Sequence, residues 1–371
     1  MRCPWDGTIA LAAAVAWLGG VLIGERAAAL PTPDHVVVVI LENHSYSQIV
    51  GSADAPFINQ LAVSGANFTN DPALDPLATR SGSHATDHPS QPNYLELYSG
   101  STQNVVQDGY PGSISEPFSA APPFTTPNLG ASLFSAGYTF ATYSEGLPAV
   151  GSDVETSPDN YARKHNPAVN WQNDSSPTAN QLPSSANQPF TTFQSIAAGP
   201  GGFDNLPTVS FVVPNQDNDM HDGSIAAGDA WLVANLAAYY AYASDPANNS
   251  LLILTYDEDG DNTATNQIAT IFAGALVVPG DYYETDINLA NPDVLRTAPG
   301  LPTLTGTAMN HWNMLATLED MYGLARIGAS AGRPAITDVW AVPVPEPASA
   351  SLLGAGIAVL AARRRRPRAR A

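Results

Sequence analysis

A serine held between two prolines is the clearest candidate nucleophile in the chain. The stretch His88–Tyr94 reads HPSQPNY, and Ser90 lies at the head of an apolar, helix-like run that ends at Tyr98. Because proline fixes its own φ angle, the hydroxyl of Ser90 can be aimed with little residual freedom, as a nucleophile requires. The same pattern is also typical of a plain surface turn, so the residues elsewhere in the chain decide between these two interpretations.

Two acidic pairs follow apolar runs at the points where strands are expected to stop. Glu42-Asn43 come directly after His35–Leu41, and Asp257-Glu258 come after Leu251–Tyr256. Together with Ser90 they predict one divalent metal site, because Ca²⁺, Mg²⁺ and Mn²⁺ prefer oxygen ligands and zinc and iron also accept carboxylates. A metal there would lower the pKa of the serine hydroxyl and polarise a phosphoryl oxygen, as attack on a phosphoester requires. For each pair alone, a solvated turn is the alternative.

Four of the seven histidines, His88, His165, His221 and His311, lie in polar loops beside predicted strand ends. Each could orient phosphate oxygens, protonate a leaving alkoxide or ligate a metal, and each could equally be an ordinary surface histidine. Asp217 and His221 have an Asp-x₃-His spacing that would place both near one ion. We therefore consider a second metal site, formed by Asp217, His221 and His311.

The elements that must position these residues alternate as strand, loop and helix. Continuous β-branched runs such as HVVVVIL at His35–Leu41 are typical of strands buried on both faces of a mostly parallel sheet. The segment 146–205 is predicted to be long and irregular, as functional lids and binding surfaces often are. Further strands are predicted at Tyr138–Tyr143, Thr208–Val213, Leu251–Tyr256 and Ile268–Val278, and helices at Pro56–Asn67, Leu129–Gly137, Ala226–Ala243 and Asn313–Tyr322.

The polar clusters follow three separate strands, and this placement favours an enzyme. In an open α/β sheet the binding crevice lies at the carboxyl ends of the strands, so the clusters can converge there. We predict one α/β domain over residues 30–341, with a mostly parallel sheet sandwiched by helices. Nothing within it repeats, and no linker is evident.

Six motifs in order resemble one known family. They are ENHSY at Glu42, HPSQPNY at Ser90, RKHNP at Lys164, PNQDNDMHDG at His221, LTYDEDG at Asp257 and NHWNMLATLEDMYGL at His311. They resemble the phosphoesterase family that joins bacterial and fungal acid phosphatases with phosphatidylcholine-type phospholipases C, within the alkaline phosphatase superfamily. The resemblance covers about residues 34–325 and implies an alkaline-phosphatase-like core.

The resemblance also implies roles for individual residues. It implies a phosphoseryl intermediate at Ser90 and a metal held by Glu42, Asn43, Ser90, Asp257 and Glu258. It implies catalytic contacts to phosphate from His165, His221 and His311, and within the same motifs we expect substrate contacts from His88, Asn93 and Lys164. The acidic pair continues here as Asp259-Gly260-Asp261, where many relatives have a histidine and glycines, so this sequence departs from the family's pattern directly beside the expected metal ligands.

Two other motifs are set aside. Gly328–Gly332 reads GASAG and matches the nucleophile-elbow pattern G-x-S-x-G, but it follows a predicted helix and no histidine comes after it. The acidic run that begins at Asp257 resembles a calcium loop, yet it lacks the glycine at position six and the glutamate at position twelve of an EF-hand.

Both ends of the chain read as sorting signals. Residues 1–29 are typical of a secretory signal peptide, with Arg2, an apolar run from Ile9 to Ile23 and a small-residue cleavage site. A retained anchor is the competing view, but the run is shorter than the roughly 20 residues that span a bilayer. The only cysteine, Cys3, lies in this segment, so cysteine chemistry is excluded from the exported domain.

Residues 342–371 resemble a PEP-CTERM sorting tail of Gram-negative bacteria. Pro345-Glu346-Pro347 precedes a short apolar stretch, Leu352–Ala362, and then an arginine-rich end. The resemblance implies cleavage by an exosortase during export to the periplasm, the outer envelope or the extracellular matrix. Until then, the apolar stretch would hold the chain in the inner membrane with its arginines in the cytoplasm. An ordinary C-terminal anchor is the alternative.

The charge balance narrows the function. Without its two ends the domain keeps six basic residues against more than 30 acidic ones, which argues against nucleic acid or an anionic membrane surface as a partner. We therefore predict an exported metal-dependent phosphoesterase, first of all an acid-phosphatase-like phosphomonoesterase. A phospholipase C or other phosphodiesterase on the same scaffold is the alternative, and a non-catalytic envelope or matrix protein is the alternative from another class.

Overall fold

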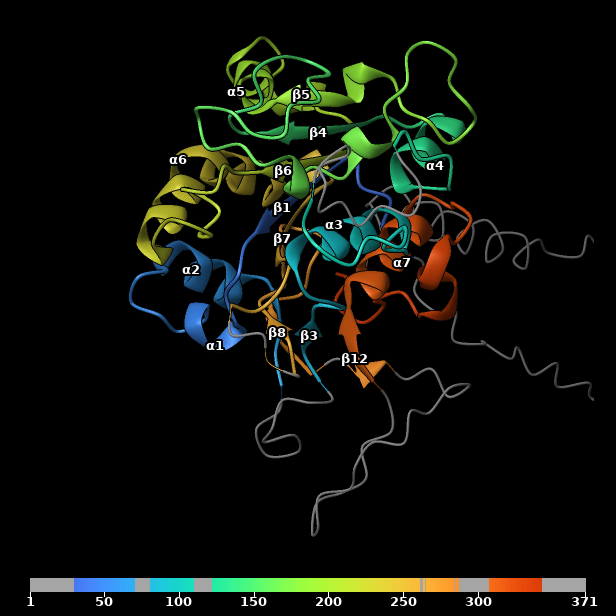
Figure 1. The fold of residues 1–371 in the computed structure, drawn as a ribbon. Coiled ribbons are helices and arrows are strands. Elements are labelled where there is room, and N and C mark those ends of the chain that lie inside the picture. Colours follow the sequence, from blue (N-terminus) through green and yellow to red (C-terminus); the bar gives the residue numbers. More distant parts are fainter. Residues whose placement is uncertain are drawn as a thin grey trace, which may run out of the picture.

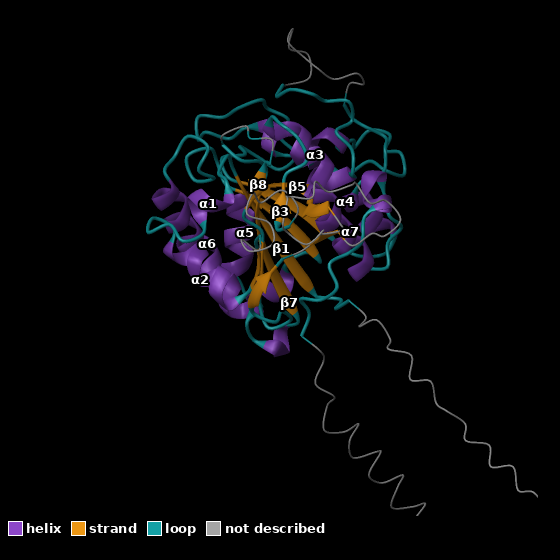
Figure 2. Ribbon diagram, turned by 90° about the horizontal axis from the view of Figure 1, so that it is seen from below, coloured by secondary structure: helices purple, strands orange, loops and turns teal. Residues whose placement is uncertain are grey.

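A large β-sheet lies between two layers of helices (Figures 1 and 2). The computed structural model describes residues 30–70, 81–109, 122–260, 263, 265–283, 285–286 and 307–341. The strands are β1 His35–Leu41, β2 Ala66–Phe68, β3 Ser83–His84, β4 Phe140–Ser144, β5 Asn187–Pro189, β6 Val209–Val213, β7 Ser250–Tyr256, β8 Gln267–Ile268, β9 Ile271–Ala273, β10 Gly280–Tyr282, β11 Thr285–Asp286 and β12 Thr307–Asn310. The α-helices are α1 Tyr46–Ile49, α2 Pro56–Ser64, α3 Ser90–Ser99, α4 Leu129–Ser135, α5 Phe190–Ala198, α6 Ile225–Ala243 and α7 His311–Met321.

Short 3-10 helices interrupt the loops. They are η1 Arg163–His165, η2 Ala168–Trp171, η3 Ser184–Ala186, η4 Gly202–Asn205, η5 Pro246–Asn248 and η6 Gly328–Gly332. The larger sheet has the strand order β10-β2-β9-β7-β1-β6-β4-β5, and five of its seven neighbouring pairs are parallel. A smaller sheet has the order β11-β12-β3-β8. The predicted α/β domain with a mostly parallel sheet is therefore confirmed.

Strand β1 shows why helices cover both faces. Its alternate side chains point to opposite sides, so Val36 and Val38 lie in one core with α3, α4 and α7. Val37 and Val39 lie in the other core with α2, α5 and α6. Each such buried side chain contributes about 1.5–3 kcal/mol to folding. A strand that is apolar at every position buries all of its side chains only if both of its faces are covered. Figure 2 shows the two helix layers on either side of the strands.

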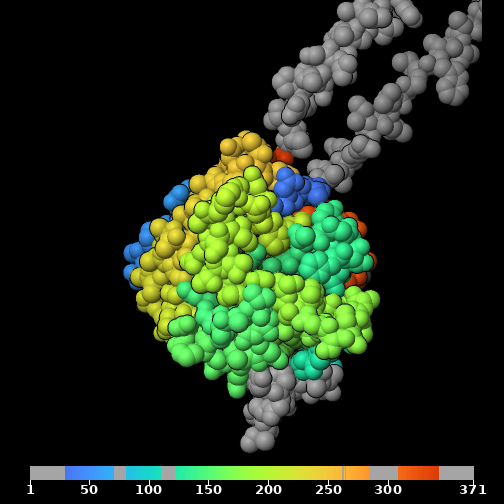
Figure 3. Space-filling view, turned by 90° about the horizontal axis from the view of Figure 1, so that it is seen from above, coloured from blue at the N-terminus to red at the C-terminus, as the bar shows by residue number. Residues whose placement is uncertain are grey.

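The segment 146–205 contains more regular structure than was predicted for it. Strand β5 and helix α5 lie within it, and β5 pairs in parallel with β4 to become the edge of the sheet. The expectation of an irregular region is wrong at these two elements. Both are short, and β5 ends in Pro189, so neither develops a long periodic pattern in the sequence. The green segments in Figure 3 show this part of the chain covering one face of the molecule.

Helix α2 is capped by a residue from α6. The carboxylate of Asp229 accepts hydrogen bonds from the backbone N–H groups of Phe57, at 3.1 Å, and Ile58, at 2.9 Å. Ala55, in the N-cap position, makes no side-chain cap of its own. Asp229 therefore satisfies donors that the first turn of a helix leaves unpaired, and its negative charge matches the helix dipole.

Replacing Asp229 by alanine is expected to lower the free energy of unfolding by about 2–3 kcal/mol, because it leaves two buried N–H groups without acceptors. Urea unfolding of both proteins measures the loss. Asp204→Asn, an exposed acid in the same layer that accepts from Tyr242, serves as control. Equal stability of Asp229→Ala and the wild type would show that water replaces the carboxylate.

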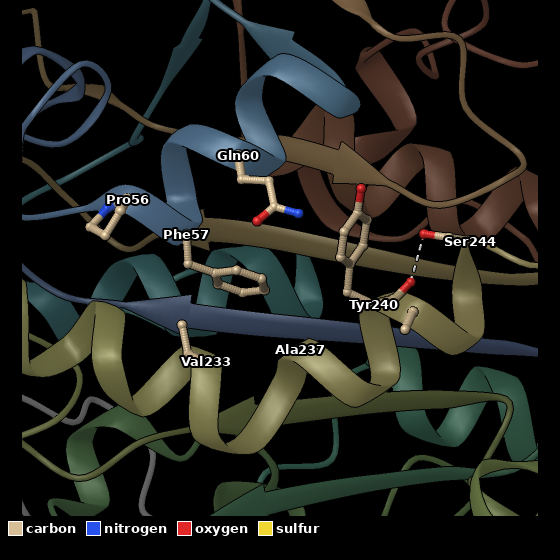
Figure 4. A pocket seen from close by; sticks show the side chains of 8 residues that line it. Pro56, Phe57, Gln60, Val233, Ala237, Tyr240 and Ser244 are labelled. Carbon is tan, nitrogen blue, oxygen red and sulfur yellow. Dashed lines mark hydrogen bonds between the residues drawn. The ribbon is translucent and has the colours of Figure 1, made fainter.

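The same two helices border a shallow groove (Figure 4). Its lining includes Phe57 and Gln60 from α2, Val233 and Tyr240 from α6, and Ser244, the residue that follows α6. These residues belong to the helix layer opposite α3. The groove is therefore separate from Ser90 and its surroundings.

The G-x-S-x-G sequence has a structural role. Ser330 is fully buried, and its hydroxyl donates to Oε2 of Glu319 at 2.6 Å, while Oε1 of Glu319 accepts from the N–H of Ile327 at 3.0 Å. Burial raises the pKa of Glu319 to about 7. This carboxyl ties the η6 turn to helix α7, as expected of a small-residue loop rather than a nucleophile elbow.

Candidate active site

Three neighbouring strands lead into buried acidic residues. Glu42 directly follows β1, Asp257 and Glu258 follow β7, and Asp219 lies in the loop after β6. The N–H of Asp257 donates to the carbonyl of Leu41 at 3.0 Å, and the N–H of Glu42 donates to the carbonyl of Asp219 at 2.8 Å. Since β7, β1 and β6 are adjacent and parallel, their carboxyl ends bring four carboxylates to one edge of the sheet.

Ser90 is the first residue of helix α3 and faces this acidic cluster. Its Oγ lies 3.0 Å from Oε2 of Glu42 and 3.2 Å from Oε1 of Glu258, so it can donate its proton to either carboxylate. Its side chain is 2% exposed. The N-terminal end of a helix carries partial positive charge that favours an anionic oxygen or a phosphate group. The position therefore suits a serine that loses its proton during attack.

The loop before Ser90 is held in place by Asn93. Its Oδ1 accepts from the N–H groups of Thr86 and Asp87, and its Nδ2 donates to the carbonyls of Asp87 and Pro89. The side chain is fully buried, and these contacts use its polar atoms. The amide of Asn93 thus fixes the backbone that orients Ser90, and its substrate contact stays a prediction.

Burial and mutual repulsion shape the electrostatics of the acidic cluster. Burial raises the pKa of Glu42 well above its usual range, and the charges of Asp257 and Asp219 raise it further. Burial also raises the pKa of Asp219. It raises the pKa of Asp257 to about 7 and that of Glu258 to about 7. A cation among these groups would reverse such shifts, because opposite charge favours the ionised form.

The donor set fits a divalent cation. Oδ2 of Asp257 and Oδ2 of Asp219 are buried and have no hydrogen-bond partner within the described part of the chain. In addition, Glu42, His165 and His221 each offer one ligand atom, and these three atoms lie within 4.8 Å of one another. Carboxylate oxygens suit Mg²⁺, Mn²⁺ and Ca²⁺, and an added imidazole extends the range to zinc and iron.

Asn43 contacts the cluster through its backbone. Its N–H donates to Oδ1 of Asp257 at 3.1 Å, and its φ angle of 52° lies in the left-handed region that asparagine tolerates. A Cβ atom on Gly260 would lie 2.2 Å from the carbonyl oxygen of Asn43, so glycine permits the close approach of the two loops. No described contact places the side chain of Asn43, and its role as a metal ligand stays a prediction.

His165 lies between two carboxylates. Its Nε2 is 3.3 Å from Oε1 of Glu42, and its Nδ1 is 3.3 Å from Oδ2 of Asp219. The ring stacks on Tyr94 with 5.2 Å between centroids, and the Tyr94 hydroxyl donates to Oε1 of Glu42 at 2.6 Å. Burial lowers the pKa of His165, and the charge of Lys164 lowers it further. A neutral ring here offers a lone pair to a cation or a proton.

His221 and Lys164 form a more accessible side of the cluster. The rings of His221 and His165 are 5.8 Å apart, and Nδ1 of His221 lies 2.8 Å from Oδ1 of Asp222. Nζ of Lys164 is 3.4 Å from Nε2 of His221 and 2.9 Å from Oδ2 of Asp108. Burial lowers the pKa of Lys164, but Asp108 and the nearby carboxylates raise it more. The ammonium therefore stays protonated and can bind a phosphoryl oxygen.

His88 and His311 contact the end of β7 in different ways. Nδ1 of His88 is paired with Glu258 and its Nε2 lies 3.8 Å from Oδ1 of Asp259, so this histidine orients an acid of the cluster. His311 is the first residue of α7, and its Nε2 contacts the carbonyl of Tyr256 at 3.0 Å. Burial lowers the pKa of His311 to about 4. His311 is therefore neutral at physiological pH.

The second metal site is not assembled as predicted. Asp217 is exposed and its Oδ1 accepts from Asn160 at 3.0 Å, and neither Asp217 nor His311 joins His221 in a ligand group among the described residues. Asp219 is the acid that faces His165. A spacing of four residues places side chains on one face of a helix, but this segment is a loop between β6 and α6.

Three residues of the site escaped the sequence interpretation: Asp219, Tyr94 and Asp108. Asp219 lies in the same motif as His221, and Tyr94 lies four residues after Ser90, which is one turn of α3. That helical spacing is a signal from which Tyr94 could have been found. Asp108 lies outside the motifs and gives no comparable signal.

A model described as the phosphoesterase family matches residues 78–325, more than half of the chain. The chain belongs to the phosphoesterase family. A curated member named phosphatidylinositol-3-phosphatase, from Mycobacterium tuberculosis, is 42% identical over 338 residues, which are 90% of this chain and 92% of the relative. This phosphoesterase is therefore a phosphoric ester hydrolase by family.

More distant relatives include fungal enzymes. An acid phosphatase of Aspergillus fumigatus is 28% identical to this phosphoesterase over 259 residues. The aligned region covers 66% of this chain and 48% of the fungal relative. A solved structure from the alkaline phosphatase superfamily of Vibrio parahaemolyticus aligns at 13% identity, with 84% of this chain and 72% of that chain covered and a TM-score of 0.48.

A PEP-CTERM protein-sorting motif matches residues 343–366 of the phosphoesterase. The motif implies export in Gram-negative bacteria. The predicted signal peptide, residues 1–29, and the predicted tail, residues 342–371, lie outside the described residues. Of the helices in the described ranges, none is both long and apolar enough to cross a membrane.

Proposed function

We propose that this protein is an exported, metal-dependent phosphomonoesterase that works through a phosphoserine intermediate at Ser90. The placement of Ser90 carries the proposal. Its buried hydroxyl lies in the first turn of α3, within 3.2 Å of carboxylates from two strand ends. In a family of phosphoester hydrolases, these surroundings favour a nucleophile over a turn residue.

The residues of the chain can carry out both halves of the reaction. The Oγ atom of Ser90 attacks phosphorus in line with the leaving oxygen, and its proton passes to a carboxylate within hydrogen-bond distance. Lys164 binds a non-bridging oxygen, and His221 donates a proton to the departing alkoxide. A water molecule then attacks the phosphoserine from the vacated side, which releases phosphate and restores the Ser90 hydroxyl.

Glu42, Ser90, Asp257 and Glu258 would hold one divalent cation, with Asn43 as the fifth ligand predicted from the sequence. When bound, the cation supplies positive charge that lowers the pKa of the serine hydroxyl and offsets the charge of the phosphoryl group. The cluster supports this proposal through its buried carboxylates with raised pKa values. Metal analysis of the purified protein distinguishes Ca, Mg, Mn, Zn and Fe.

Cleavage of a phosphomonoester bond is favoured over cleavage of a phosphodiester bond such as the one that a phospholipase C hydrolyses. The relative with 42% identity is itself named a phosphatase, and the strongly acidic composition opposes docking on an anionic lipid surface. One preparation tested with p-nitrophenyl phosphate, bis-p-nitrophenyl phosphate, phosphatidylcholine and a short-chain phosphatidylinositol 3-phosphate is expected to hydrolyse the two monoesters at least about tenfold faster, a difference of about 1.4 kcal/mol in activation free energy. Faster turnover of the diester or of phosphatidylcholine would favour the phosphodiesterase alternative.

We further propose that export delivers residues 30–341 as the mature domain. Residues 1–29 are removed as a signal peptide, and residues 342–371 are anchored transiently in the inner membrane and cleaved by an exosortase-type enzyme. The match to the sorting motif supports this route. Mass spectrometry of the exported protein determines both termini, and an intact arginine-rich end would contradict the proposed processing.

A further inference from the structure

Asp108 uses both of its carboxylate oxygens at the entrance to the cluster. Oδ1 accepts from the backbone N–H of Gln91, the residue after Ser90, at 3.0 Å. Oδ2 accepts from Nζ of Lys164 at 2.9 Å. The next residue, Gly109, donates its N–H to Oε1 of Gln91 at 2.8 Å. The carboxylate of Asp108 therefore joins the first turn of α3 to the lysine beside the nucleophile.

The two donors that hold Asp108 are the kinds of group that bind phosphate. N–H groups in the first turn of a helix point toward its N-terminal end and stabilise anions there. A lysine ammonium binds phosphate oxygens through charge-assisted hydrogen bonds. Gln91 follows Ser90 directly in the first turn of α3, so its N–H belongs to the end of the helix at which Ser90 lies. Asp108 thus offers two anionic oxygens to donors that the phosphoryl group also needs.

Asp108 also adds negative charge where it opposes an incoming dianion. The carboxylates of Glu42 and Glu258 already contact the Ser90 hydroxyl, and Lys164 is a cation whose charge lowers the pKa values of both acids. The carboxylate of Asp108 is 31% exposed and the side chain of Lys164 is 20% exposed, so both are accessible from solvent. A phosphate that binds beside Ser90 must therefore share the Lys164 ammonium with the carboxylate of Asp108, which is already bound to that ammonium.

We propose that Asp108 is a positioning residue that competes with phosphate oxygens for Lys164 and the Gln91 N–H, and so weakens the binding of the product phosphate. This inference rests on the proposed phosphomonoesterase function. A site that held phosphate through Lys164 without competition would release its product slowly. Asp108 provides an internal anion that replaces the departing phosphate on both donors.

The Asp108→Asn variant separates this role from a purely structural one. Asparagine keeps an oxygen acceptor for the Gln91 N–H and removes the charge that occupies Lys164. The variant is expected to bind inorganic phosphate about tenfold more tightly, because Lys164 can then make its charge-assisted hydrogen bonds to phosphate without a competing carboxylate. Titration calorimetry with inorganic phosphate measures the Kd, and inhibition of p-nitrophenyl phosphate hydrolysis measures the Ki, with KM expected to fall in parallel.

Asp320→Asn is the matched control, because Asp320 forms a similar ion pair with Arg326 away from the cluster. It is expected to leave the phosphate Kd unchanged. Asp108→Ala, expected to shift the Kd in the same direction as Asp108→Asn, replaces that variant if it does not fold. Equal or weaker phosphate binding by the Asp108 variants, including no binding by any of the proteins, overturns the inference. A wild type that binds phosphate but hydrolyses no phosphoester would instead contradict the proposed function.

Discussion

A Ser90→Ala variant is expected to lose phosphomonoesterase activity by roughly 10⁴-fold or more, as removal of a catalytic nucleophile does in other hydrolases. The hydroxyl is the atom proposed to bond to phosphorus, and among the described residues no second hydroxyl lies within hydrogen-bond distance of both Glu42 and Glu258. Steady-state hydrolysis of p-nitrophenyl phosphate measures the loss in kcat. Acid quenching of the wild type with substrate, followed by peptide mass spectrometry, should locate a phosphoryl group on Ser90.

Ser99→Ala provides a control within the same helix. Ser99 is buried at the far end of α3, where its hydroxyl donates to the carbonyl of Leu95, and its loss is expected to affect stability but not the phosphoserine. Both variants should first be compared with the wild type by thermal unfolding. Full activity in Ser90→Ala, or a phosphoryl group trapped on another residue, would refute the proposed nucleophile.

An Asp257→Asn variant is expected to lose the stabilisation that a divalent cation gives the wild type. After chelation, the wild type should show a rise in Tm when Mn²⁺ or Ca²⁺ is added, because a ligand that binds only the folded state stabilises it. The variant keeps the acceptor for the Asn43 N–H but lacks one anionic ligand, so its Tm should respond little and its activity should be near zero.

Without metal, the order of stability should reverse. Burial and the charge of Glu258 disfavour the ionised form of Asp257 and raise its pKa to about 7. Above that pH the neutral asparagine removes this cost, so the metal-free variant is expected to be more stable than the metal-free wild type by about 1–3 kcal/mol. Differential scanning fluorimetry with and without metal measures both effects on the same samples. Asp204→Asn, in the opposite helix layer, should behave as the wild type. A Tm that rises equally in Asp257→Asn and the wild type would contradict a cation bound at this carboxylate.

The sequence was informative where one strong physical signal controlled the outcome. The β-branched run at β1 predicts burial on both faces, and the acids that follow β1 and β7 must meet because parallel neighbours end at the same edge. Ser90 at the head of a helix was likewise predicted from its proline-framed position. These features depend on local patterns and on the topology of a parallel sheet.

The remaining features depend on the conformations of loops, and the spacing of residues in the sequence does not determine these conformations. The loop after β6 turns Asp219 toward His165 and leaves Asp217 exposed, although both acids belong to one polar run. Asn93 resembles a substrate ligand in the sequence, yet its amide bonds to the preceding loop. Asp108 meets Lys164 across 56 residues of chain, a pairing that only the folded structure reveals.

Two residues of helix α3 contact the two carboxylate oxygens of Glu42, so one rigid element positions both contacts. Ser90 contacts Oε2 and Tyr94, one helical turn later, donates to Oε1. A rigid-body shift of the helix therefore displaces the nucleophile and the support of the acid together, whatever its cause. Leu95, buried in the core beneath them, is thus linked to turnover as well as to folding. Substitutions there that shift α3 by a few tenths of an ångström should lower kcat at temperatures where the protein is still fully folded.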